Sequence, residues 1–216
     1  MAPFFQNFTN PFTKLTELSL YTWIALACFV LLAGVFFSLR RVKLDTRALV
    51  AGALSIAIAF LLSCFKFYSM PQGGSITPAS MLPMMLYAWC YGPAAGLAAG
   101  IVYGFLQLLQ DFYVVHPLQL LMDYVFAFGA LGLVGFFRKN LLVGVTVAGL
   151  VRFVLHTVSG VVFFASYAPE GQNVWLYSLG YNGSVVLPDL AICLVIAAIP
   201  TVRATITRLY RPVVKA

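Results

Sequence analysis

Four ionisable residues stand inside long apolar stretches of the 216-residue chain: Asp123, Arg152, His156 and Asp189. An ionisable group within a membrane span is energetically costly, so such residues are candidates for binding or transport. Arg152 and Asp189 fall near the middle of their stretches, and we expect them to form a structural ion pair between neighbouring helices. Asp123 and His156 fall about 10 Å below the outer boundary at a helical rise of about 1.5 Å per residue, and neither has an obvious charge partner.

Polar and aromatic residues lie at a similar depth to Asp123. At helical spacing, Asp123 shares a face with His116 and Gln119, and His156 shares a face with Phe164. The wider group comprises Tyr113, Tyr124, Phe164, Tyr167, Trp175, Tyr177 and Asn182. The aromatic residues alone would also fit an interfacial belt of Tyr and Trp. An unpaired carboxylate below such a belt instead predicts a site for an organic cation, because the carboxylate supplies charge while the rings supply cation–π attraction.

The composition indicates that helices in a lipid bilayer carry these residues. Hydrophobic residues make up 62% of the chain and charged residues only 9%, whereas soluble proteins average about half and about a quarter. The mean hydropathy is +0.96. The net charge of +7 does not indicate nucleic-acid binding, because Lys and Arg stand in short clusters between apolar runs and form no basic stripe with interleaved aromatics. We therefore predict an all-α integral membrane protein.

Seven stretches are candidates for membrane-spanning helices, since about 20 helical residues cross about 30 Å of hydrocarbon. The third is short and opens near Pro78. The stretches are 20–39, 47–66, 79–93, 95–113, 117–137, 142–165 and 181–202. We expect the first helix to be an appendage, with a basic linker, on a six-helix unit. The predicted organisation is an N-terminal extension over 1–46, a six-helix membrane domain over 47–205 and a basic tail over 206–216.

The distribution of basic residues predicts the orientation. If the linker after the first helix is cytoplasmic, alternation of the spans places ten of the thirteen basic residues inside. The loops 70–77, 111–117 and 167–181 then lie outside and contain no Lys or Arg. We expect an outer N-terminus and a cytoplasmic C-terminus. The inner residues are Arg40, Arg41, Lys43, Arg47, Arg138, Lys139, Arg203, Arg208, Arg211 and Lys215, while Lys14 and Lys66 are exceptions.

Other kinds of chemistry have little support in the sequence. The four cysteines are widely spaced and form no CxxC, so we expect neither disulfides nor a metal site, and we interpret Cys28, Cys64, Cys90 and Cys193 as small core residues. The N-terminal apolar run has no evident cleavage site and is interpreted as an uncleaved span. No Walker A motif is present, so any ATP hydrolysis must take place on another chain.

Several short stretches resemble one protein family. They are Met70–Ser75, His116-Pro117, Asp123-Tyr124, Phe128–Leu133, His156 with Ser159-Gly160, Phe163–Gly171, Tyr177–Leu179 and Tyr181–Ser184. They are similar to thiamine-specific substrate-binding subunits, or S-components, of energy-coupling factor vitamin importers, over about residues 47–205. The resemblance implies a non-enzymatic protein of the bacterial plasma membrane that binds thiamine in an outward-facing pocket. It also implies delivery to the cytoplasm with a transmembrane coupling subunit and two ATPases, which use ATP, and no cofactor of its own.

The resemblance also implies a set of ligand contacts: Asp123, Tyr124, Tyr113, His156, Tyr177 and Asn182. Asp123 would accept a hydrogen bond from the aminopyrimidine, Asn182 and His156 would fix polar edges, and tyrosine faces would enclose the rings. Two positions depart from relatives that carry stacking tryptophans, since this chain has Phe164 and Gly74 there. Phe164 is expected to be a contact with a weaker cation–π term, because Trp offers the best face.

A small-xxx-small pattern, Ala53 to Ala57, lies on the second predicted span. Small residues let another helix approach closely in lipid. The pattern resembles the patch with which S-components dock onto the coupling subunit, so we expect Ala53 and Ala57 to form the docking face.

Two alternative functions stay open at this point. One is an S-component or small carrier for another vitamin or a thiamine precursor, because the departures at Phe164 and Gly74 affect specificity. The other is an intramembrane enzyme that uses His156 and Asp123 as acid and base. The absence of HExxH and GxSxG motifs and the single carboxylate at this depth disfavour the enzyme.

Overall fold

The computed structural model describes residues 44–210 without a gap and six single positions before them, at 23, 27, 30, 34, 37 and 40. The predicted appended helix at 20–39 and Cys28 therefore lie largely or wholly outside the described residues, as does the end of the basic tail.

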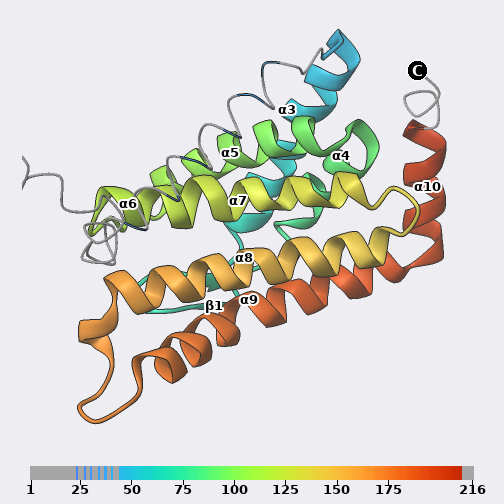
Figure 1. The fold of residues 1–216 in the computed structure, drawn as a ribbon. Helices are drawn as coiled ribbons and strands as arrows, with labels where there is room; N and C mark the ends of the chain where they lie inside the picture. The colour runs from blue at the N-terminus through green and yellow to red at the C-terminus, as the bar shows by residue number, and fades with distance from the viewer. Residues whose placement is uncertain are drawn as a thin grey trace, which may run out of the picture.

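The described chain is helical, and five of its helices are long and apolar enough to cross a membrane. They are α3 (Thr46–Ser63), α5 (Pro93–Gln110), the continuous helix Pro117–Phe136, α8 (Leu141–Phe163) and α9 (Val174–Ala198) (Figure 1). Smaller elements are α4 (Leu82–Tyr91), α10 (Pro200–Tyr210) and the antiparallel hairpin of β1 (Tyr68–Ser69) and β2 (Ser75–Ile76). The all-α membrane fold is thus confirmed, while the count of seven spans stays a prediction.

The helix Pro117–Phe136 changes its winding along its length. It begins as α6 (Pro117–Leu120), continues through a π-helical turn (Leu121–Phe126) and α7 (Ala127–Gly129), and ends as a 3₁₀ helix (Ala130–Phe136). In a π turn the backbone hydrogen bond spans five residues, as from Ala127 N–H to Met122 O here. A π turn is a local irregularity that is often found at functional sites.

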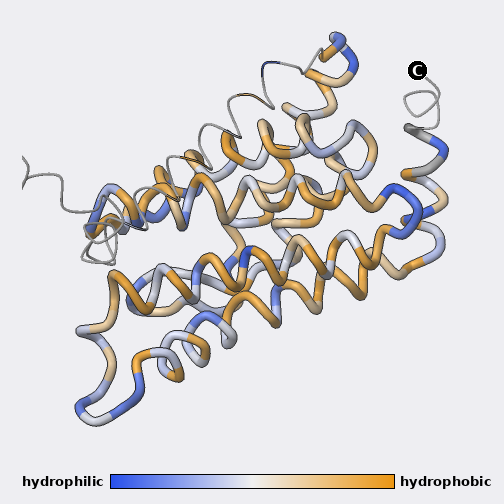
Figure 2. The backbone as a smooth tube through the Cα atoms, viewed as in Figure 1, coloured by the Kyte–Doolittle hydropathy of each residue, from blue (hydrophilic) through white to orange (hydrophobic). Residues whose placement is uncertain are grey.

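The long helices pack along one another in the order that the chain connects them. α8 and α9 run antiparallel and side by side, the Pro117–Phe136 helix packs on both α5 and α8, and α3 packs on α4 and α5 (Figure 1). Hydrophobic residues dominate the helices, and hydrophilic ones gather at the loops and at a few positions inside the bundle (Figure 2). Those interior positions are where a binding site must be sought.

The last long helix differs from the predicted range 181–202 at both ends. α9 begins at Val174, because the side chain of Asn173 accepts hydrogen bonds from Trp175 N–H at 2.9 Å and Leu176 N–H at 3.3 Å, which caps the first turn. It ends at Ala198, and α10 starts separately at Pro200, whose ring nitrogen has no hydrogen to donate. The predicted outer loop 167–181 is therefore wrong in its second half.

At the predicted short third span the structure has a buried helix that is too short to cross a membrane by itself. α4 has ten residues, about 15 Å at 1.5 Å per residue, which is half the hydrocarbon thickness. Met81, Met84, Met85 and Ala88 are each 0% exposed. They form the centre of the core between α3, α5, α8 and the Pro117–Phe136 helix, so α4 is surrounded by protein.

Glycines bring α5 into backbone contact with the Pro117–Phe136 helix. Gly96, Gly100 and Gly104 recur every four residues on one face of α5. A Cβ atom added to Gly104 would lie 1.9 Å from the Tyr124 carbonyl oxygen, and one added to Gly100 would lie 2.3 Å from that of Phe128. Small residues allow this approach, which is a main source of helix association in lipid.

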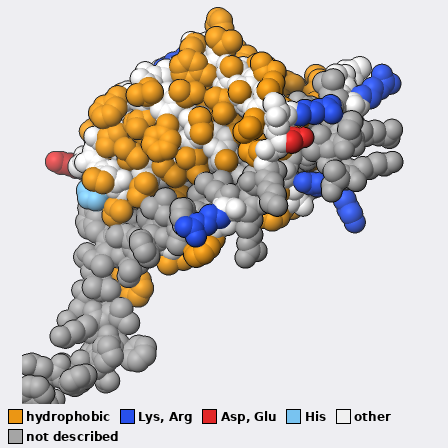
Figure 3. Space-filling model, turned by 90° about the horizontal axis from the view of Figure 1, so that it is seen from above, with side chains coloured by type: hydrophobic (Ala, Val, Ile, Leu, Met, Phe, Trp, Pro, Cys, Tyr) orange, Lys and Arg blue, Asp and Glu red, His pale blue; other side chains and the backbone are white. Residues whose placement is uncertain are grey.

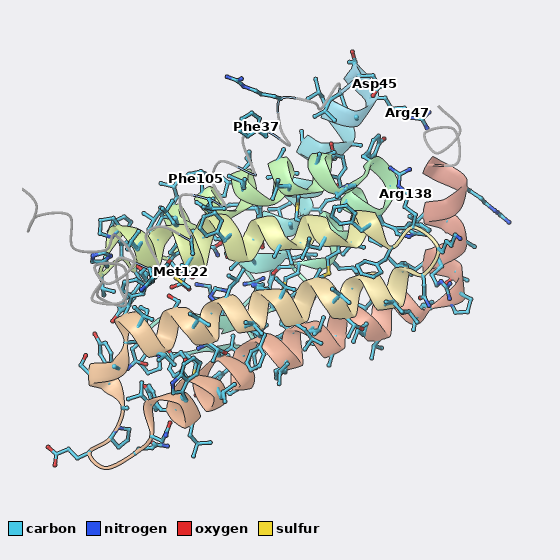
Figure 4. All side chains as sticks on the ribbon, viewed as in Figure 1. Phe37, Asp45, Arg47, Phe105, Met122 and Arg138 are labelled. Atoms are coloured by element: carbon cyan, nitrogen blue, oxygen red, sulfur yellow. The ribbon has the colours of Figure 1, made fainter. Side chains whose placement is uncertain are left out.

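The surface has an apolar middle and a basic end. On the face shown in Figure 3, hydrophobic side chains cover the middle, and most of the visible Lys and Arg lie toward one end. Arg47 and Arg138 both lie toward the end of the bundle that carries α10, whereas Phe105 and Met122 lie nearer the other end (Figure 4). Arg47 and Arg138 thus lie at one end of the bundle, as the predicted orientation requires, while Lys66 follows α3 at its other end and the orientation stays a prediction.

The described cysteines do not all behave as predicted. Cys90 and Cys193 are free and buried, as expected for small core residues. Cys64 is exposed at the end of α3, where its thiol donates a hydrogen bond to the carbonyl of Phe60 at 3.3 Å, so its interpretation as a core residue is wrong.

Candidate ligand-binding site

A cavity lies inside the bundle and is lined in part by the segments that follow α5 and α8, which are at the ends of these helices far from Arg138. Its volume is about 160 Å³. A cavity needs only about 10–15 Å³ to admit one water, so this one has room for several waters or for part of an organic ligand. All seven residues predicted to contact the ligand line it: Tyr113, Asp123, Tyr124, His156, Phe164, Tyr177 and Asn182. Their contact with a ligand stays a prediction.

Asp123 lies in the π turn and is held by three hydrogen-bond donors. Its Oδ2 atom accepts from Gln119 Nε2 at 2.7 Å and from Ser159 Oγ at 3.0 Å, and its Oδ1 atom lies 3.0 Å from His156 Nδ1. The expectation of an unpaired carboxylate is therefore wrong. Each carboxylate oxygen can accept two hydrogen bonds, so Oδ1 retains capacity for one donor from a ligand.

His156 uses both of its ring nitrogens within the protein. Nδ1 contacts Asp123, and Nε2 accepts a hydrogen bond from Arg152 Nε at 3.3 Å. The predicted role of fixing a polar edge of the ligand would require one of these bonds to break. What the ring can offer without that loss is its π face.

The predicted ion pair between Arg152 and Asp189 is not formed. Within residues 44–210, Lys66 forms an ion pair with Asp111 and the ring of His156 contacts Asp123, whereas no ion pair joins Arg152 to Asp189. Asp189 instead accepts a hydrogen bond from Thr77 Oγ1 at 3.0 Å, on the segment after the hairpin. The guanidinium of Arg152 lies over the Phe128 ring, 4.2 Å from its centroid, in a cation–π arrangement. Both residues line the inner part of the cavity.

Asn182 lines the cavity, and its amide nitrogen is engaged within the protein. Its Nδ2 atom donates to the carbonyls of Ser178 at 3.0 Å and His156 at 3.3 Å. With the amine side engaged by α8 and α9, Oδ1 is the atom that remains for a ligand, and it can only accept.

Aromatic side chains surround the outer part of the cavity. Tyr113 and Phe164 are stacked with ring centroids 5.9 Å apart, and the hydroxyls of Tyr113 and Tyr167 lie 2.9 Å apart. This hydrogen bond raises the pKa of the Tyr113 phenol above its ordinary value. Tyr177 and Tyr181, on α9, form a tilted pair at 6.0 Å.

The hairpin covers the cavity with its tip and was not predicted from the sequence. Tyr181 Oη accepts from Gln72 N–H at 2.9 Å and donates to the Gly73 carbonyl at 3.0 Å. Gly73 and Gly74 both have φ of +89°, a region that favours glycine. The adjacent glycines are the turn signal that could have revealed the hairpin. Gly74 lines the cavity but offers no side chain.

His116 does not share the predicted face with Asp123. It precedes the helix, where its Nδ1 atom accepts from Leu118 N–H at 3.1 Å, and its ring stacks on Phe163 at 5.2 Å. The extended backbone of His116 and the π turn after Leu120 break the regular spacing on which the prediction depended. Gln119 does line the cavity beside Asp123.

Comparison with known proteins identifies the family of this chain. The sequence model described as "Thiamine transporter protein (Thia_YuaJ)" matches residues 49–209. The chain belongs to the thiamine transporter protein family. It is 37% identical over 163 residues to "Thiamine transporter ThiT" of Bacillus subtilis, which covers 67% of this chain and 84% of that protein.

Further relatives agree. "Thiamine transporter ThiT" of Lacticaseibacillus paracasei is 30% identical over 139 residues, covering 55% of this chain and 69% of that protein. The solved structure of ThiT from Listeria monocytogenes superposes with a TM-score of 0.66 at 26% identity, covering 74% of this chain and 97% of that one. The predicted family and multi-pass membrane fold are confirmed. Because the thiamine transporter protein family is non-enzymatic, the alternative of an intramembrane enzyme is dropped.

Two further observations concern the predicted docking face for a partner subunit and the possibility of a metal site. Ala53 and Ala57 are both exposed on α3, so no described residue covers the predicted docking face. Between residues 44 and 210, no group of three or more His, Cys, Asp or Glu side chains could hold a metal ion.

Proposed function

We propose that this protein is the thiamine-binding subunit of an ATP-driven vitamin importer and that the cavity around Asp123 is its binding site. The observation that carries the proposal is the Asp123 carboxylate, in contact with Gln119, Ser159 and His156, in the wall of a cavity that aromatic rings also line. Thiamine is an organic monocation with a thiazolium ring, so it matches both the charge and the aromatic surface. Family membership supports the same ligand.

The donors and acceptors of the cavity suit the second ring of thiamine. An aminopyrimidine carries an amine, which donates, and ring nitrogens, which accept. Asn182 Oδ1 and the remaining lone pair of Asp123 Oδ1 are acceptors for the amine. Tyr113, Phe164 and Tyr177 offer ring faces for stacking against the two heterocycles.

The location of the cavity supports capture from outside the cell. Its lining includes the segments that follow α5 and α8, at the ends of these helices far from Arg138. The positive-inside rule assigns the basic end to the cytoplasm, so the cavity faces outward, with the N-terminus outside and the C-terminus inside.

Delivery to the cytoplasm requires other chains. Partners of the energy-coupling factor type, a transmembrane coupling subunit and two ATPases, would supply ATP hydrolysis. The exposed Ala53 and Ala57 on α3 support close approach of a partner helix. Replacing both by Trp should abolish uptake in cells that contain the partners and leave thiamine binding unchanged. Val154→Trp, at a position 56% exposed on α8, is the matched control and should keep uptake. Loss of binding in the Ala variants would contradict the docking role.

Binding to the purified protein tests the proposed ligand. Thiamine, its phosphates, its pyrimidine precursor, riboflavin and biotin are each titrated while intrinsic fluorescence is followed. We expect thiamine to bind most tightly and Asp123→Asn to weaken it at least tenfold. If the pyrimidine precursor or riboflavin binds in preference to thiamine, the chain is a subunit for that compound and the proposed ligand is wrong.

A further inference from the structure

Arg152 is a cation in the interior of the bundle, and neither an ion pair nor a predicted ligand contact explains its presence there. Arg152 lies in the middle of α8, one helical turn from His156. Its guanidinium is stacked on Phe128, and its Nε–H donates to His156 Nε2 at 3.3 Å. Asp189, the nearest candidate for an ion pair, accepts from Thr77 instead.

The hydrogen-bond pattern determines where His156 carries its proton. A guanidinium has donors only and is charged at every pH that a protein encounters, so the Nε2 atom facing it must be an acceptor. The proton of the neutral imidazole is then on Nδ1, the atom 3.0 Å from Asp123 Oδ1. The three residues form a chain of donors that runs in one direction, from Arg152 through His156 to Asp123.

We propose that Arg152 is a positioning residue of the binding site. It keeps His156 in the neutral Nδ1–H tautomer, so that His156 donates a hydrogen bond to the Asp123 carboxylate and leaves its full negative charge available to a cation. The inference rests on the proposed function, in which Asp123 binds a cation. The opposite tautomer would turn a lone pair of Nδ1 toward the carboxylate and repel it. An imidazolium would neutralise Asp123 and remove the attraction for a cation.

The groups around His156 are consistent with this assignment. Asp123 faces it from the π turn, and Arg152 faces it from its own helix. From α9, the amide of Asn182 donates to the His156 backbone carbonyl, and Asp189 is turned to Thr77. Arg152 is therefore the group that faces Nε2 in the described structure.

Nuclear magnetic resonance of ¹⁵N-labelled histidine tests the proposal without a ligand. The chain has two histidines, and the structure assigns them opposite tautomers. His116 accepts from Leu118 N–H at Nδ1, so its proton is on Nε2, whereas that of His156 is on Nδ1. Protonated and unprotonated ring nitrogens have widely separated ¹⁵N shifts. His116→Asn, which retains a helix-capping side chain, assigns the two sets of signals.

Variants of Arg152 connect the tautomer to binding. Arg152→Met removes the donor, and we expect it to abolish the fixed Nδ1–H signature of His156, to leave His116 unchanged and to weaken thiamine binding at least tenfold. Arg152→Lys retains a cationic donor and should restore the signature and most of the affinity. Arg138→Met removes a charge at the basic end of the bundle and is the control, with both readouts unchanged.

The outcomes separate this inference from the proposed ligand. A wild-type spectrum with the His156 proton on Nε2, or an Arg152→Met variant that retains the signature and the affinity, overturns the positioning role even if thiamine binds. Absence of thiamine binding alongside the expected spectrum overturns the proposed ligand instead. If Arg152→Met does not fold, the wild-type spectrum and Arg152→Lys still decide the assignment.

Discussion

Replacing Gly104 by Ala should weaken ligand binding through the backbone. The added Cβ atom would lie 1.9 Å from the Tyr124 carbonyl oxygen, whereas ordinary contacts begin at about 3.4 Å, so the two must separate by roughly 1.5 Å. Tyr124 follows Asp123 in the π turn. Even if α5 takes up half of the movement, the Pro117–Phe136 helix must shift by about 0.7 Å relative to α8, which disrupts the 3.0 Å contacts of Asp123 with Ser159 and His156.

The expected magnitude follows from the bonds at risk. A hydrogen bond to a charged group contributes about 1.5–3 kcal/mol, and 1.4 kcal/mol is a factor of ten in affinity, so the dissociation constant of thiamine should rise about 10- to 100-fold. Overpacking also costs about 1–3 kcal/mol of stability. Equilibrium titration and thermal unfolding of the same purified samples measure both effects.

Gly96→Ala is the matched control on the same helix. Its Cβ atom would lie 2.3 Å from that of Ala88, so it should lower stability to a similar degree, but Gly96 does not line the cavity. We expect its affinity for thiamine to stay within about threefold of wild type. The reasoning is refuted if Gly104→Ala also retains wild-type affinity, or if the two variants lose affinity equally.

Two other substitutions have definite expected outcomes. Phe164→Trp should tighten thiamine binding about two- to fivefold, because Trp gives a stronger cation–π and stacking term beside Tyr113, and fluorescence quenching measures it. Unchanged affinity would show that ring 164 does not touch the ligand. Tyr181→Phe removes both hydrogen bonds to the hairpin tip, at Gln72 and Gly73, each worth about 1 kcal/mol. Hydrogen exchange of the tip and thiamine dissociation should both become faster, and equal rates in the two proteins would contradict the role of Tyr181.

Much of the architecture could be predicted because lipid imposes simple rules on a sequence. Apolar length gave the positions of most spans, and distance from the segment ends placed Asp123 and His156 at the same level. In the structure they are six and seven residues, about 9–10 Å, from the outer ends of their helices. Depth alone thus brought together two residues that are 33 positions apart in the sequence and lie in hydrogen-bond contact.

The depth of a residue in the membrane, estimated from the end of its apolar segment, does not show which residues at the same depth contact one another. Arg152 and Asp189 lie at similar heights, yet Thr77 reaches Asp189 from a loop whose path has no periodic signal. The π turn was also invisible, because it shifts the register of a helix without changing its hydropathy. Two sequence signals do indicate features of this fold. Asn173 is a helix-capping residue at the start of α9, and glycine at 96, 100 and 104 indicates close packing of α5 on another helix.

The charge of Asp123 is the centre of the proposed mechanism of recognition, and a comparison of two ligands measures it directly. Wild-type protein and Asp123→Asn are each titrated with thiamine and with an analogue in which a neutral thiophene replaces the thiazolium. We expect the wild type to prefer the cation at least tenfold and the variant to lose that preference while still binding the analogue. Equal preference for the cation in both proteins would contradict the assignment of Asp123 as the group that recognises the charge.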